Sequence, residues 1–91
     1  MKLSLEDIRA KFDALVDGTQ TLEQIAASAT AAMRASDERR LDLEEKFADQ
    51  IWEAVLYLSG VDLQVSPGRY LHNRDDFLNA RQRILGEVQA P

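Results

Sequence analysis

The chain has 91 residues, of which 45% are hydrophobic and 30% charged, and it contains no cysteine. This length allows one core, so we expect a single helical domain over residues 1–91, and the lack of thiols excludes disulfides and thiolate metal sites. The formal net charge of −5 argues against nucleic acid as a partner, because phosphate contacts need clustered lysine and arginine.

The first two helices are indicated by their capping residues. Ser4 begins a helix with acids in its first turn, and Gly18 ends it after residues 5–16. Thr21 and Gln24 form a capping box that starts a second, alanine-rich helix. Apolar residues recur at helical spacing in both: Leu5, Ile8, Phe12, Leu15 and Val16 in the first, and Leu22, Ile25, Ala26, Ala29 and Met33 in the second.

The boundary between the second and third helices is expected near Ser36. Ser36 precedes two acids, which is an N-cap signal, although one helix from Thr21 to Leu58 is an alternative. We favour the break, since a continuous helix would leave residues 34–40 almost wholly solvated. The third helix then runs from about Asp37 to Leu58. One face of it is apolar: Leu43, Phe47, Ile51, Ala54 and Leu58.

A long loop from Val61 to His72 precedes the last helix and contains the turn signal Ser66-Pro67-Gly68. A loop of this length often has a function. Asn73 caps the fourth helix, whose inward face is apolar: Phe77, Ala80, Ile84 and Val88. Four amphipathic helices predict an all-α fold, a compact antiparallel four-helix bundle with no sheet.

The sequence offers few catalytic or metal-binding side chains. His72 is the only histidine, so a nucleophile, a base and an orienting group cannot be assembled. No phosphate loop, pair of histidines or calcium loop is present. We therefore expect no enzyme activity, no catalytic residue, no metal and no cofactor. The arginines of the fourth helix are expected to be solvated or paired with acids of the third: Arg74, Arg81 and Arg83.

The N-terminal residues give no signal peptide, because Glu6, Asp7 and Arg9 interrupt their apolar residues. No apolar run approaches the roughly 20 residues of a membrane-spanning helix. We expect a cytoplasmic protein without a membrane partner.

The most regular surface feature of the sequence is a row of acids in the third helix. Its members are spaced four, three, four and four residues apart: Glu38, Asp42, Glu45, Asp49 and Glu53. On a helix they occupy a stripe about 80° wide, with Trp52 on its flank and Leu56 in its own direction. A charged, solvated face is the simplest interpretation. However, like charges four residues apart destabilise a helix, and tryptophan is a typical interface anchor, so we predict that these seven residues bind a protein partner.

Several segments also form a pattern along most of the chain. They are Phe12 followed by Asp17-Gly18, Thr21-Leu22-Glu23-Gln24, Ile51–Leu58 with Asp62 after it, and a proline-containing loop into Tyr70-Leu71 and Asp76-Phe77. This pattern resembles the small helical immunity proteins of the colicin D type, although no segment is a diagnostic motif. Alanines replace expected aromatics in the second helix, and the charged stretch from Ser36 to Glu45 is unusual. The resemblance implies an inhibitor that binds a basic, nuclease-like toxin domain with acidic side chains, and the stripe is the candidate surface.

A second hypothesis is a helical structural or regulatory module that self-associates. Trp52 and its apolar neighbours would then form the contact in a homodimer. A monomer with an acidic face favours the toxin partner, whereas a tight homodimer favours self-association.

Overall fold

The computed structural model describes residues 1–86 of the chain. Within them lie four α-helices, α1 (Leu5–Asp17), α2 (Leu22–Asp37), α3 (Ala48–Leu58) and α4 (Arg74–Leu85), and a 3-10 helix, η1 (Glu45–Phe47). Strands β1 (Lys2–Leu3) and β2 (Asp42–Leu43) form one two-stranded sheet, and β3 (Gln64–Ser66) and β4 (Arg69–Tyr70) form another. The fold is therefore mostly helical, as predicted. The prediction that the fold contains no sheet is wrong, and a regular antiparallel four-helix bundle is not confirmed.

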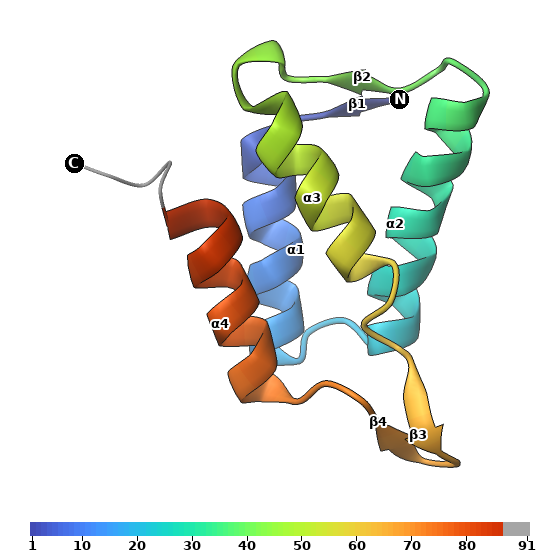
Figure 1. Cartoon of the computed structure of the whole chain (residues 1–91), viewed down its shortest axis with the longest axis vertical. Coiled ribbons are helices and arrows are strands. Elements are labelled where there is room, and N and C mark those ends of the chain that lie inside the picture. The colour runs from blue at the N-terminus through green and yellow to red at the C-terminus, as the bar shows by residue number, and fades with distance from the viewer. Residues whose placement is uncertain (87–91) are drawn as a thin grey trace.

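The helices surround one apolar core. Helix α3 packs against both α1 and α2, and α4 packs against α1 and α3 (Figure 1). The largest fully buried side chains come from all four α-helices and from the position three residues after α3: Ile8, Phe12, Ile25, Ile51, Val55, Leu58, Val61, Ile84 and Leu85. Val88, predicted to face inward, lies outside the described residues. None of the helices in residues 1–86 is long and apolar enough to cross a membrane.

The predicted capping residues of α1 and α2 are confirmed. Ser4 Oγ accepts a hydrogen bond from the Asp7 amide at 3.2 Å, and Thr21 Oγ1 accepts one from the Gln24 amide at 3.1 Å. Gly18 ends α1 in the left-handed conformation, with φ of 74°, which glycine adopts without a steric cost. These local bonds fix where the chain turns from α1 into α2.

The predicted third helix over residues 37–58 is wrong in its first half. Helix α2 continues to Asp37, and the chain then runs extended into β2, which pairs with β1 in parallel. The Asp42 amide donates to the Met1 carbonyl at 2.7 Å, and Glu44 Oε1 accepts from the Leu5 amide at the start of α1 at 2.9 Å. The predicted break is confirmed, but it falls after Asp37, so Ser36 lies within α2 and does not cap a third helix. The next α-helix, α3, begins only at residue 48.

The reason for this difference is an alternation of buried and exposed residues. Leu41 and Leu43 are half-buried, whereas Asp42 and Glu44 are exposed, which is the two-residue period of a strand. Their backbone groups find partners in β1 instead of within a helix. Phe47, predicted on the buried helix face, lies in η1 and is half-buried against the core.

Candidate functional site

The predicted acidic stripe does not form one helix face. Glu38 caps the C-terminus of α2, Asp42 lies in β2 and Glu45 lies in η1. Only Asp49 and Glu53 lie on α3, because the segment before α3 is not helical. The geometric basis for one continuous acidic surface is therefore lost.

Helix α3 still brings four of the predicted residues to one side. At 100° per residue, Asp49, Trp52, Glu53 and Leu56 fall within about 100° of each other. Trp52 is half-buried and packs against the core, whereas Leu56 is 47% exposed. Glu53 forms an ion pair with Arg83 of α4. A partner-binding role for these residues stays a prediction.

A hairpin forms within the predicted loop and projects from the end of the molecule where α2 and α4 begin (Figure 1). Gln64 pairs with Tyr70, Ser66 pairs with Arg69, and a bulge lies between them. Gly68 turns the chain with φ of 80°. Every residue from 63 to 74 is exposed except a half-buried His72.

This hairpin segment carries no acidic residue. From Leu63 to Arg74 the charged or chargeable side chains are Arg69, His72 and Arg74. The acid-free run can be read directly from the sequence, but the acids predicted for the third helix form a more regular pattern. The hairpin is therefore a candidate surface, in the loop whose length the sequence analysis noted but whose lack of acids it did not use.

Tyr70, the last residue of β4, links the hairpin to the first turn of α2. Its hydroxyl donates a hydrogen bond to Glu23 Oε1. This bond stabilises the carboxylate and lowers the pKa of Glu23 below its ordinary value. The same bond raises the pKa of the Tyr70 hydroxyl. The contact ties together residues 47 positions apart in the chain.

His72, two residues after β4, contacts aromatic side chains of the helices. Its ring lies 5.6 Å from the ring of Tyr57, which in turn stacks on Phe12 at 6.1 Å. His72 Nδ1 lies 3.8 Å from Asp76 Oδ2, and burial raises the pKa of Tyr57, with a smaller contribution from the charge of Asp76. Both contacts hold β4 and the residues just after it, while the tip of the hairpin is exposed.

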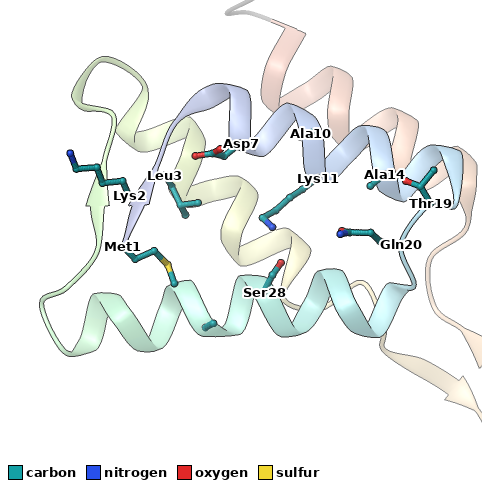
Figure 2. Close-up of a pocket in the computed structure, with 11 residues that line it drawn as sticks. Met1, Lys2, Leu3, Asp7, Ala10, Lys11, Ala14, Thr19, Gln20 and Ser28 are labelled. Atoms are coloured by element: carbon teal, nitrogen blue, oxygen red, sulfur yellow. The ribbon is translucent and has the colours of Figure 1, made fainter.

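A groove of about 700 Å³ lies between α1 and α2. Figure 2 shows Lys11 extending from α1 across this groove toward Ser28 on α2, while Lys2 points away from it. Asp7, the acid on its rim, accepts a hydrogen bond from the Ser4 amide at 2.9 Å as part of the α1 cap. Asp7 therefore already has a structural role at the start of α1.

Most cations of α4 are already engaged. Arg83 pairs with Glu53, as the sequence predicted for acids of the third helix, whereas Arg81 pairs with Asp13 of α1 at 2.9 Å. Arg74 lies near the end of α1, with its Nε 3.4 Å from the Val16 carbonyl oxygen. Within residues 1–86, no group of three acids or histidines is placed to hold a metal ion.

These observations define a small, mostly helical protein that carries an exposed two-stranded ribbon on a helical base. The chain belongs to the family described as "YxzC DNA-binding protein", whose family model matches residues 2–82. It is 32% identical over 66 residues to "Uncharacterized protein YxzC" of Bacillus subtilis (strain 168), an alignment that covers 72% of this chain. The chain spans about half, 49%, of the length of that relative. No solved structure matches the chain.

The family assignment corrects two predictions. The resemblance to colicin D-type immunity proteins is wrong, because the matching family is a different one, named for DNA binding. The prediction of a basic toxin as partner, and of no nucleic acid, conflicts with that same description. Net charge misled the second prediction because it averages over a surface on which the acids are unevenly placed.

Proposed function

We propose that this protein binds DNA through the β3–β4 hairpin. The description of its family supports this function. On this proposal the protein is a regulatory module that acts by binding and not by catalysis. Its helices serve as an antiparallel, bundle-like scaffold within one domain, and the protein works in the cytoplasm, where bacterial DNA is accessible.

The observation that carries the proposal is the exposed, acid-free hairpin segment from residue 63 to 74. A two-stranded ribbon fits the major groove of DNA, which is about 12 Å wide. Arg69 and Arg74 supply positive charge for phosphates, and Gln64 and Ser66 supply hydrogen-bonding groups for base edges or the backbone. Because no carboxylate lies in this segment, the hairpin itself does not repel a duplex.

The overall charge of −5 limits how strong this binding is. Each phosphate contact adds about 0.9 to the slope of log affinity against log salt concentration. Two or three contacts from one hairpin give a slope of about −2 to −3, far below that of strongly basic DNA-binding proteins. We therefore expect binding that is clear at low salt and lost at moderate salt.

Fluorescence anisotropy with a labelled duplex of about 20 base pairs, roughly two helical turns, tests the proposal. Arg69→Ala should weaken binding and reduce the salt slope by about 0.9. Arg83→Ala is the matched control, because it also removes one positive charge but from a side chain already paired with Glu53. It should change the slope less.

Two results would contradict the proposal. The first is a wild-type protein that fails to bind any duplex at low salt. The second is an equal loss of affinity in Arg69→Ala and Arg83→Ala, which would indicate an effect of total charge and not of the hairpin. Circular dichroism of both variants shows whether the fold is retained.

A further inference from the structure

A second group of cations lies at the C-terminal end of α2, far from the hairpin. Arg34, Arg39 and Arg40 are all exposed there. The carboxylate of Glu38 pairs with Arg40, and Asp37 is the other acid of the group. This end of α2 is held against the N-terminal strand, since the Met1 nitrogen donates to the Arg40 carbonyl at 2.7 Å.

Arg39 occupies a backbone conformation that normally selects glycine. Its φ is 57°, and it is the one non-glycine residue with positive φ in the described part of the chain. The Arg39 amide donates to Ser36 and the Arg40 amide to Ala35, which is the Schellman pattern that ends many helices with glycine. A long cation at this position, where glycine would be easier to accommodate, indicates a use for its side chain.

The solvent-exposed side of α2 runs from the hairpin to the arginines at the C-terminal end of this helix. Glu23 and Arg34 lie in nearly the same direction on the helix, three turns and about 16 Å apart. Glu23 holds Tyr70 of the hairpin, so the hairpin sits at one end of this line and Arg34 at the other. No acid occurs between Gln24 and Ser36. A polyanion lying along α2 therefore meets no carboxylate from residue 24 to residue 36, and Glu23, at the hairpin end of this line, accepts the hydrogen bond of Tyr70.

The dimensions match one turn of DNA. The longest extent of the Cα trace is 38 Å, and the hairpin and the C-terminal end of α2 lie at opposite ends of that axis in Figure 1. A turn of duplex is about 34–36 Å long, or about 10 base pairs. Contacts at both ends would thus meet the same face of a straight duplex one turn apart.

We infer that one DNA duplex lies along α2 and is contacted at two points, by the hairpin and by Arg34, Arg39 and Arg40. This inference rests on the proposed function and adds a second phosphate-binding surface to it. The hairpin supplies the first contact, and the arginines fix the direction of the duplex relative to α2.

Duplexes of two lengths separate the two contacts. On a duplex of about 20 base pairs, Arg39→Gly should reduce the salt slope by about 0.9 and weaken binding. On a duplex of about 6 base pairs, too short to reach both ends of α2, the same variant should bind as the wild type does. Arg39→Lys keeps the charge and should retain binding to the long duplex, and Asp37→Asn, which removes the nearby acid, should strengthen it.

The outcomes distinguish this inference from the proposed function. If Arg39→Gly leaves the slope on the long duplex unchanged while Arg69→Ala still weakens binding, the second contact is wrong and hairpin binding stands. An equal effect of Arg39→Gly on both duplex lengths also overturns the two-point arrangement. If the wild-type protein binds neither duplex, the proposed function fails first. A melting temperature of Arg39→Gly at or above that of the wild type excludes unfolding as the cause of lost binding.

Discussion

Arg39→Gly should make the protein more stable. An L-residue in the left-handed region costs about 1–2 kcal/mol, and Arg39 is held there with φ of 57°. Glycine removes that cost, but it loses more backbone entropy than arginine does when the protein folds. This entropy loss reduces the gain in stability by about 0.5–1 kcal/mol. The free energy of unfolding should therefore rise by about 0.5–1 kcal/mol. For a domain of this size, 1 kcal/mol corresponds to about 4–8 °C in melting temperature.

Urea denaturation followed by circular dichroism measures this change. The bonds that end α2 come from backbone groups, so glycine keeps them: the Arg39 amide lies 3.0 Å from the Ser36 oxygen and the Arg40 amide 2.7 Å from the Ala35 oxygen. Arg39→Ala is the control, because it removes the charge and retains the left-handed cost. If Arg39→Ala stabilises the protein as much as Arg39→Gly does, relief of charge repulsion is the cause and the backbone argument is refuted.

Three further predictions concern the core, a helix end and the hairpin. Phe12→Ala should lower the free energy of unfolding by about 3–5 kcal/mol, since Phe12 is 0% exposed; a loss below about 1 kcal/mol in urea denaturation would contradict its central place in the core. Gly18→Ala should cost about 0.5–1 kcal/mol, because the left-handed φ of 74° costs alanine about 1–2 kcal/mol and the lower backbone entropy of the unfolded alanine chain offsets about 0.5–1 kcal/mol of it. No other described group lies within 4 Å of the added carbon, and Gly18→Asn, which tolerates this conformation better, should cost less. Tyr70→Phe should raise the pKa of Glu23 toward 4.5, because the hydroxyl that lowers it is lost. The folded-state pKa of Glu23 is depressed, so its contribution to stability is present above its unfolded pKa and is lost as pH falls through the folded value; an NMR titration in which Glu23 is unchanged would refute the contact.

Local signals in the sequence predicted the helix ends well. Ser4, Thr21 and Asn73 each bond to an amide three residues later, so the information lies within one turn of chain. The end of α1 at Gly18 is also a local signal, because it depends on the left-handed backbone conformation of one residue. The fourth helix and its cap were found in this way, and the break near Ser36 was also located.

The segment from residue 38 to 47 could not be predicted in this way. Its partner is β1, about 40 residues earlier in the chain, and the alternation from Leu41 to Glu44 covers only four residues, which is too few to distinguish a strand from a helix. Leu43 and Phe47 happen to continue the helical spacing of Ile51 and Leu58, which extended the predicted helix falsely. The acidic stripe depended on that helix, so it was lost with it.

The family resemblance failed for a related reason. Helix caps, glycine stops and apolar spacing are requirements of any short helical domain, so a match in their order carries little information about function. The acid-free segment from residue 63 to 74 was more specific, because few folding requirements exclude acids from a twelve-residue exposed stretch. On the proposed function, local charge is therefore a better guide to the partner than the total of −5.

The pairing of β1 with β2 also has a consequence for the order of folding. It closes a ring of about 40 residues that contains α1 and α2, and the entropy of closing such a ring must be offset by contacts formed before it. By this argument the helices pack against each other early in folding, and β1 pairs with β2 last. The same weak closure should appear in amide hydrogen exchange: the amides of Asp42 and Glu44, which donate to the carbonyls of Met1 and Leu3, should exchange through local opening well before those of Ile51 and Val55 in the middle of α3.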